Sequence, residues 1–244
     1  MSMAGQHNVH NKWIPARIPQ RCRVVNGIDV WLIDLCATDL QNSAFLSSQE
    51  RKRSRAFVHP HRRQAYIASH VALRRLLAAY CARPVQELVF QQGPYGKPEL
   101  INADRLYFNL SHSKERALIA ISDCAEVGAD VESFGDQTPV DIIAQTFSKR
   151  EQDILVSVCD DLHTDVFFEG WCRKEAALKA EGTGLTDDLT DMDVLNVKVC
   201  RTGEKAGSHP KNWFFYPLPK IAGYGRALAA SIADLDLRTW LCVP

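Results

Sequence analysis

Two carboxylates lie close together near the middle of the chain, within the run E-V-G-A-D-V-E at residues 126–132. The run is typical of a short strand, and residues two apart on a strand point to the same face, so Asp130 and Glu132 can converge on one point. Two oxygen ligands at this spacing suit Mg²⁺, which binds carboxylates together with substrate phosphates and water. On its own the stretch favours an exposed strand end with two solvated acids, and the case for a metal depends on other residues.

A third carboxylate, that of Glu175, lies on a predicted helix four residues before Lys179. Residues four apart share one face of a helix, and a Glu–Lys pair at this spacing is usually a surface ion pair worth about 0.2–0.5 kcal/mol. The second hypothesis is that Glu175 completes a metal site with the two acids above and that Lys179 lies over a phosphate. Apolar residues beside the pair, among them Trp171, indicate that part of this helix is buried, which weakens the surface hypothesis.

Hydroxyl and imidazole groups follow another predicted strand, in the sequence Ser111-His112-Ser113. A polar turn is one interpretation. A Ser–His pair can also indicate a hydrolase, but adjacent residues at a strand end do not point at each other, and no G-x-S-x-G elbow surrounds Ser111. Donors at the end of a strand serve better as phosphate ligands.

The densest positive charge is the run at residues 51–55, followed by Arg62 and Arg63, and a separate lysine, Lys97, stands in a G-K-P turn. The basic run is typical of a solvated helix face. A nucleic-acid interface is disfavoured, because the run is short and lacks interleaved aromatic residues. Arginine and lysine side chains are also what a ligand with several phosphates needs.

The composition of the 244-residue chain is that of an ordinary globular protein, with 46% hydrophobic and 24% charged residues. The length suits one large domain or two small ones. Basic and acidic residues balance at 29 each, so the net charge indicates no class of partner. The eight cysteines are scattered without a C-x-x-C, and we expect reduced, mostly buried thiols rather than a zinc site or disulfides.

Nothing in the chain predicts a membrane segment, because no run of about 18 apolar residues occurs. Residues 1–20 are polar, lack the apolar core of a signal peptide and are expected to form a loose arm. We therefore expect no membrane contact and a cytoplasmic location.

The predicted elements alternate unevenly between strands and helices, which favours an α+β fold over a doubly wound sheet. Strands are expected at 27–35, 105–110, 116–122, 126–132, 193–200, 213–216 and 226–233, with a turn at 91–98 and a loop at 205–211. Helices are expected within 47–82, at 141–147, from a capping box at Ser148 to about 158, and from Thr164 or Asp165 to Ala180. The sequence R-A-L-I-A at 116–120 is echoed by R-A-L-A-A at 226–230, which chance similarity of alanine-rich strands explains by default and which two related halves would also leave.

Four motifs occur in order along the chain: G-K-P at 96–98, F-N-L-S-H-S at 108–113, G-A-D-V-E at 128–132 and W-C-R-K-E-A-A-L-K-A-E-G at 171–182. Together they resemble the signatures G-K-P, F-N-x-S-H-S, G-x-D-x-E and W-x-x-K-E-(x)3-K-x-x-G of the 4′-phosphopantetheinyl transferase superfamily, in its longer, Sfp-type form. The resemblance covers roughly residues 27 to 235. Each motif is unspecific alone, but four in register rarely coincide.

The resemblance implies a reaction. Members of this family transfer the 4′-phosphopantetheine group of coenzyme A to a serine of an apo acyl or peptidyl carrier domain and release adenosine 3′,5′-bisphosphate. By resemblance, Asp130, Glu132 and Glu175 hold Mg²⁺ together with the pyrophosphate of coenzyme A. Glu175 takes the proton from the carrier serine, directly or through water, and Lys179 steadies the pyrophosphate and the leaving group.

The resemblance also implies contacts with coenzyme A in the first part of the chain. Ser111 and His112 match family positions that contact its phosphates, with His112 near the 3′-phosphate, and Lys97 matches the lysine at the nucleotide end. For the basic residue that reaches the 3′-phosphate we choose Arg53, with Arg63 second, because a proline interrupts the family pattern there.

The fold implied by the family is two similar α+β halves around a pseudo-twofold axis, with the site between them. We divide the chain into an arm (1–20), a half that binds the nucleotide of coenzyme A (21–125) and a half that carries the metal and catalytic residues (126–244), and we expect a monomer. Carriers of fatty-acid, polyketide and peptide synthesis all remain open. Because the longer form is often permissive, carriers of secondary metabolism are favoured weakly.

Two rival functions use the same residues. An Mg²⁺-dependent hydrolase or transferase acting on another nucleotide pyrophosphate needs the same three acids but no carrier. A binding module that has lost its chemistry would typically have lost an acid or the lysine, and here all are present.

Overall fold

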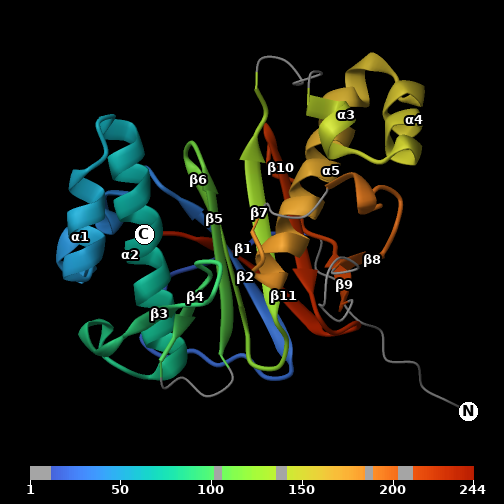
Figure 1. The fold of residues 1–244 in the computed structure, drawn as a ribbon. Helices are drawn as coiled ribbons and strands as arrows, with labels where there is room; N and C mark the ends of the chain where they lie inside the picture. Colours follow the sequence, from blue (N-terminus) through green and yellow to red (C-terminus); the bar gives the residue numbers. More distant parts are fainter. Residues whose placement is uncertain (1–11, 102–105, 136–141, 185–188, 203–210) are drawn as a thin grey trace, which may run out of the picture.

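The computed structural model describes residues 12–101, 106–135, 142–184, 189–202 and 211–244. Within them the chain forms a five-stranded sheet in the order β1-β11-β2-β6-β5, a four-stranded sheet in the order β7-β10-β9-β8, and a hairpin of β3 and β4 (Figure 1). The strands are β1 (Ile14–Ala16), β2 (Gly27–Asp34), β3 (Phe90–Gln92), β4 (Pro98–Leu100), β5 (Tyr107–Ser113), β6 (Arg116–Ser122), β7 (Val127–Ser133), β8 (Val199–Thr202), β9 (Lys211–Tyr216), β10 (Tyr224–Ala230) and β11 (Asp236–Cys242). The α-helices are α1 (Ser48–Arg55), α2 (Pro60–Cys81), α3 (Ile143–Thr146), α4 (Lys149–Ser157) and α5 (Asp160–Glu181). The α+β prediction is confirmed.

The elements stack in four layers, and the burial of β2 shows why. Nearly the whole length of this strand is buried on both faces. Trp31 and Ile33 pack in one core cluster with α2, whereas Val30 and Leu32 pack in a second cluster with β7 and β10. Successive strand residues point to opposite faces, so β2 joins the helix layer on one side to the other sheet on the other. A third cluster joins the second sheet to α5. The order is therefore helix, sheet, sheet, helix, as Figure 1 shows.

The ends of several helices follow from local sequence. Ser47 and Ser148 form capping boxes with Glu50 and Glu151 at the starts of α1 and α4, which confirms the capping box predicted at Ser148. The predicted helical stretch 47–82 is divided into α1 and α2, and Pro60 begins α2, because the first turn of a helix needs no N–H from that residue. The prediction that α5 starts at Thr164 or Asp165 is wrong. It starts at Asp160, because Cys159 adopts the extended backbone of an N-cap without a side-chain cap.

The two halves repeat one arrangement. In the first, β2 is followed by α2 and by the β5–β6 pair, and the sheet order is β2-β6-β5; in the second, β7 is followed by α5 and by the β9–β10 pair, in the order β7-β10-β9. The echoed sequences at 116–120 and 226–230 therefore lie in equivalent strands, β6 and β10. The repeated arrangement supports the interpretation of the echo as a trace of two related halves.

Pairing between distant segments changes three predictions. The strand β11 was not predicted, and it pairs in parallel with β2, so the end of the chain crosses back into the sheet of the first half. The strand β1, within the predicted arm, pairs in parallel with β11, whereas residues 1–11 lie outside the described residues. The strand predicted at 193–200 shrinks to β8, because Val194 and Leu195 donate their N–H groups to a glutamate side chain instead of a neighbouring strand. Most of the predicted loop at 205–211 also lies outside the described residues.

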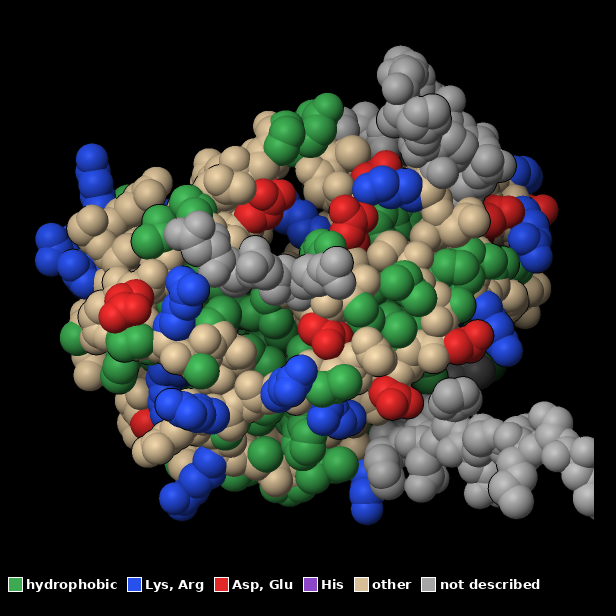
Figure 2. Space-filling model, turned by 90° about the horizontal axis from the view of Figure 1, so that it is seen from below, with side chains coloured by type: hydrophobic (Ala, Val, Ile, Leu, Met, Phe, Trp, Pro, Cys, Tyr) green, Lys and Arg blue, Asp and Glu red, His purple; other side chains and the backbone are tan. Residues whose placement is uncertain are grey.

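Two further expectations from the sequence concern the charge on the surface and the burial of the cysteines. On the face drawn in Figure 2, acidic and basic side chains are interspersed among apolar ones, in keeping with the balanced charge. Cys172 and Cys200 are buried, but the other six cysteines are partly or fully exposed, so the expectation of mostly buried thiols is wrong. Within the described part of the chain, no helix is long and apolar enough to cross a membrane.

Among the described glycines, Gly128 of β7 has the closest neighbour, which lies on a helix. A Cβ atom at this position would lie 2.0 Å from the carbonyl oxygen of Ala176 and 2.4 Å from the amide nitrogen of Ala180, both on α5. These neighbours are backbone atoms of a helix and cannot rotate away. Only glycine therefore lets α5 lie directly on β7.

We predict that Gly128→Ala lowers the free energy of unfolding by at least about 1–3 kcal/mol, because the added methyl forces α5 away from β7. Chemical denaturation measures the loss. Gly93→Ala is the matched control: its Cβ would meet the flexible Glu99 side chain at 3.3 Å and the Lys97 carbonyl oxygen at 3.4 Å. Equal losses in the two variants would contradict the close approach at Gly128.

Candidate active site

The carboxylate of Asp130 lies at the centre of the candidate site. It is fully buried on the face of β7 that meets α5, and its Oδ1 accepts hydrogen bonds from Lys179 Nζ at 2.5 Å and from Ser111 Oγ at 2.8 Å. Its Oδ2 is buried without a hydrogen-bond partner among the described residues. A buried carboxylate oxygen without a partner is costly, so this atom is an open position for a cation or a donor.

Two further carboxylates, of Glu132 and Glu175, share this region, and the pKa of each is raised. For Glu132 the causes are burial and then repulsion from Asp130. For Glu175 burial raises the pKa, Lys179 opposes the rise, and Asp130 and Glu132 add to it. For both glutamates burial is the main cause, and the negative charge of the neighbouring acids adds to the rise in pKa. We call Asp130, Glu132 and Glu175, together with Lys179, the carboxylate site.

Lys179 reaches across to β7. Its side chain is 31% exposed, and its ammonium binds Asp130 Oδ1 and, at 3.1 Å, Ser111 Oγ. Burial alone would lower its pKa, but Asp130 followed by Glu175 and Glu132 raises it. The hypothesis of a simple surface pair between Glu175 and Lys179 is therefore wrong, because the lysine binds the buried acid of another element.

The carboxylate site suits a hard cation. In the geometry described, no group of three His, Cys, Asp or Glu residues within the described part of the chain is close enough to surround an ion, and Lys179 occupies one oxygen of Asp130. The buried Asp130 Oδ2, which lacks a hydrogen-bond partner among the described residues, is nevertheless an atom that a divalent cation would satisfy. Asp130, Glu132 and Glu175 are the residues that would hold it.

The strands β5 and β7, which are edges of the two sheets, meet through side chains. Asn109, Ser111 and Ser113 of β5 accept the N–H groups of Ala129, Val131 and Ser133 of β7, at 3.0, 3.4 and 3.1 Å. Each pair is separated by 20 residues, so the two strands run in the same direction. We call these contacts the β5–β7 junction. They supply acceptors for N–H groups along the free edge of β7 and place Ser111 beside Asp130. Sequence reasoning treated the serines as phosphate ligands and missed Asn109, although alternation along F-N-L-S-H-S placed these three on one face.

His112 points to the opposite face of β5 from Ser111 and is exposed. Partial burial of the ring, followed by repulsion from Lys179, lowers its pKa. It therefore lies near the carboxylate site without being part of the β5–β7 junction, and an exposed donor here is free to bind an anion.

Arg53 of α1 lies near two aromatic residues of α2, Tyr66 and His70. We call these three residues the aromatic cluster. The Tyr66 and His70 rings stack at 3.9 Å, and the Arg53 guanidinium lies 5.8 Å from the Tyr66 ring centre. Burial lowers the pKa of His70 to about 4, and the charges of His112 and Arg53 act in the same direction. Arg53 and His112 thus both act on His70, and sequence reasoning missed Tyr66 and His70. A common ligand of Arg53 and His112 stays a prediction.

Two predicted contact residues lie elsewhere. Arg63 is exposed on the first turn of α2, and within the described residues its guanidinium makes no hydrogen bond or ion pair. Lys97 donates to the carbonyl oxygens of Ala180 at 2.6 Å and Val127 at 3.4 Å, so its ammonium lies against the C-terminal half.

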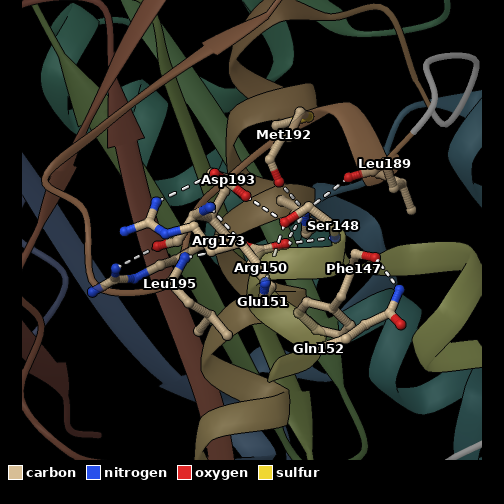
Figure 3. Close-up of polar contacts among 12 residues, drawn as sticks. Phe147, Ser148, Arg150, Glu151, Gln152, Arg173, Leu189, Met192, Asp193 and Leu195 are labelled. Carbon is tan, nitrogen blue, oxygen red and sulfur yellow. Dashed lines mark hydrogen bonds and ion pairs between the residues drawn. The ribbon is translucent and has the colours of Figure 1, made fainter. Parts of the chain in front are cut away.

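A buried ion pair holds the helix that carries Glu175. Lys174, with no exposed side-chain surface, binds Glu151 Oε2 of α4 at 2.8 Å and donates to the carbonyl oxygens of Leu189 and Met192. Figure 3 labels these three partners. The other oxygen of Glu151 accepts the N–H groups of Val194 and Leu195. Sequence reasoning assigned Lys174 no role, because a lysine beside a glutamate gives no sign of burial.

Comparison with known proteins identifies similar chains. The model of the 4′-phosphopantetheinyl transferase superfamily matches residues 126–229, which include the whole carboxylate site. The 4′-phosphopantetheinyl transferase HetI of Nostoc sp. is 32% identical over 72% of this chain and 77% of its own length. Sfp of Bacillus subtilis is 28% identical over 66% and 70%, and the mouse L-aminoadipate-semialdehyde dehydrogenase-phosphopantetheinyl transferase is 26% identical over 70% and 62%.

We predict that Mg²⁺ raises the melting temperature by several degrees at about pH 8 and by much less at about pH 5.5. The pKa values of Glu132 and Glu175 are raised in the folded protein, so their stabilising contribution is complete below the unfolded pKa and is lost as pH rises through the folded pKa. A cation that binds the ionised acids restores this loss, whereas protons compete with it at low pH. Thermal unfolding with and without Mg²⁺ at both pH values measures the effect.

The control for this prediction is a pair of variants. Glu132→Gln combined with Glu175→Gln should abolish most of the Mg²⁺ effect, whereas Glu169→Gln, an acid on α5 that pairs with Arg173, should retain it. A shift of the same size at both pH values would contradict binding at the carboxylate site.

Proposed function

The chain belongs to the 4′-phosphopantetheinyl transferase superfamily and is an enzyme of that class, and we propose that its reaction takes place at Asp130, Glu132 and Glu175. It transfers the 4′-phosphopantetheine group of coenzyme A to a carrier protein. In the proposed reaction the acceptor is a serine hydroxyl of the apo carrier, and the leaving product is adenosine 3′,5′-bisphosphate. The observation that carries the site assignment is the buried Asp130 carboxylate, with one oxygen held by Lys179 and Ser111 and the other without a partner.

Members of this superfamily generally use Mg²⁺, and the three acids are the residues we propose to hold it. A bound Mg²⁺ would neutralise charge on the pyrophosphate and the leaving group. The residues themselves prepare the site. Ser111 donates to Asp130 and fixes the orientation of the carboxylate, and the close contact at Gly128 keeps α5 at the distance this arrangement needs.

Glu175 is the proposed base. Its pKa is raised by burial and by the neighbouring acids, and a base with a pKa nearer neutrality accepts a proton more effectively at physiological pH. It takes the proton of the carrier serine directly or through one water. Lys179 remains protonated because Asp130, Glu175 and Glu132 together raise its pKa. It therefore supplies a fixed positive charge beside the pyrophosphate and the leaving phosphate.

The first half of the chain is proposed to bind the nucleotide of coenzyme A. Arg53 and His112 are exposed and both act on the charge of His70, which supports a contact with the 3′-phosphate. Arg63 remains the second candidate for the contact with the 3′-phosphate. It is exposed, but no described contact joins it to the aromatic cluster. Division of the chain at residues 20 and 125, a monomeric state and a cytoplasmic location also belong to this proposal.

The partner is an apo acyl or peptidyl carrier domain, and the exposed basic residues of α1 would attract the acidic helix that such domains present. Carriers of fatty-acid, polyketide and peptide synthesis are all candidates. The alternative function, an Mg²⁺-dependent hydrolase or transferase acting on another nucleotide pyrophosphate, uses the same acids. It differs in needing no carrier.

The test is to incubate the protein with coenzyme A, Mg²⁺ and several apo carrier domains and to weigh the carriers. We predict a mass increase of one phosphopantetheine group.

Asp130→Asn and Glu175→Gln should lower kcat/KM by at least about a hundredfold, because each removes a group that acts on the reacting atoms. Glu169→Gln, on another face of α5, should leave the rate unchanged. Consumption of coenzyme A without any modified carrier would favour the alternative function.

We also predict that Arg53→Ala raises the KM for coenzyme A about tenfold, while the KM for 3′-dephospho-coenzyme A stays nearly unchanged. The reason is the loss of one charged donor to the 3′-phosphate. Arg55→Ala, on the same helix and equally exposed, is the control and should change neither value. If Arg53→Ala weakened both ligands equally, the assignment of the 3′-phosphate contact would be wrong.

A further inference from the structure

The turn between β3 and β4 presents one lysine, Lys97, in a fixed position. The N–H of Gly93 donates to the Lys97 carbonyl and the N–H of Gly96 donates to the Gly93 carbonyl, both at 2.9 Å. Gly96 has a φ of +85°, a conformation that glycine adopts without strain. Pro98 follows at once and begins β4. The backbone therefore fixes where the lysine side chain starts.

The side chain of Lys97 leaves this hairpin and ends in the other half of the molecule. Its Nζ donates to the carbonyl oxygen of Ala180 at 2.6 Å and to that of Val127 at 3.4 Å. Its methylene chain passes Gly182, where an added Cβ would lie only 3.2 Å from Lys97 Cδ. The glycine that ends α5 thus also leaves room for the lysine.

The two carbonyls belong to the elements that carry the carboxylate site. Ala180 lies in the last turn of α5, where carbonyls lack partners within the helix and a cation is favoured by the helix dipole. It directly follows Lys179 in the sequence. Val127 is the first residue of β7, three residues before Asp130. One ammonium therefore joins the end of α5 to the beginning of β7.

The charged neighbours of Lys97 differ from those expected of a ligand for the nucleotide. Burial lowers its pKa to about 8, and the charged side chains that act on it are Glu126, Lys211 and Glu99. None of these three belongs to the aromatic cluster or to the carboxylate site. Two of the three donor positions of the ammonium are already directed at carbonyls. A contact with the nucleotide would require the lysine to give up both.

We propose that Lys97 is a positioning residue for the transfer reaction: it fastens α5 to β7 across the two halves and so holds Glu175 and Lys179 in register with Asp130. The inference rests on the proposed function. It replaces the role at the nucleotide end that the G-K-P motif implies with a role in the geometry of the acids.

The test compares Lys97→Met with wild type in steady-state transfer, using coenzyme A and 3′-dephospho-coenzyme A in turn. We expect kcat to fall about tenfold to a hundredfold, since small misplacements of catalytic groups cost that much. We expect the ratio of kcat/KM for the two co-substrates to stay within about twofold of wild type. Lys97→Arg keeps the donors and should recover part of kcat. Lys211→Met, a neighbouring exposed lysine that binds Glu126, should behave as wild type.

A second measurement needs no substrate. Hydrogen exchange of the backbone amides should be faster in Lys97→Met at the last turn of α5 and the start of β7, and unchanged in α2. If Lys97→Met does not fold, Lys97→Gln, which removes the charge and shortens the side chain but keeps an amide donor group, takes its place in both experiments. A KM increase confined to coenzyme A, or unchanged exchange together with unchanged kcat, would overturn the inference. If wild-type protein modified no carrier, the proposed function would fail, while the exchange experiment would still test the contact.

Discussion

The contact of α5 with β7 at Gly128 is the constraint on which the rest of the site depends. Asp130 is two residues from Gly128 and faces the same helix. Glu175 and Lys179 directly precede Ala176 and Ala180, the two helix residues whose backbone Gly128 approaches. Only at this separation can an ammonium on α5 reach a carboxylate on β7 at 2.5 Å. The G-x-D-x-E pattern therefore contains a spacing requirement as well as two acids, and its glycine is as necessary as its carboxylates.

The same strand must also be fixed against the first half, and here side chains replace backbone pairing. Asn109, Ser111 and Ser113 accept the N–H groups along the free edge of β7, so the two sheets meet edge to edge without becoming one. Because Ser111 also donates to Asp130, the contact that joins the halves is part of the site. Asp130 is thereby held at the boundary of the two sheets, as the proposed division of binding and chemistry between the halves requires.

Sequence reasoning succeeded where the signal is local. The capping box at Ser148 and the strand β6 depend on neighbouring residues, and both are confirmed. The assignment of the three acids to one metal site depends on a motif and stays a prediction. It failed where a distant partner decides. The strand β11 is stable because β2 and β1 pair with it, and the start of α5 at Asp160 has no side-chain cap to reveal it. The motif around Lys97 matches a lysine at the nucleotide end, and nothing nearby in sequence shows that its ammonium donates to two carbonyls of the other half.

The two lysines of the W-x-x-K-E-x-x-x-K pattern show why a motif mixes two kinds of residue. They are five positions apart, so they point about 140° apart around α5. Lys174 points into the protein, where Glu151 pairs with its charge and backbone carbonyls accept its other hydrogen bonds. Lys179 turns to the carboxylate site, keeps part of its surface exposed and has an excess of acids around it. The first fixes the rotation of the helix, and this rotation is what aims Glu175 and the second lysine at Asp130. The buried ion pair of Lys174 thus helps to set the direction in which the partly exposed Lys179 leaves the helix.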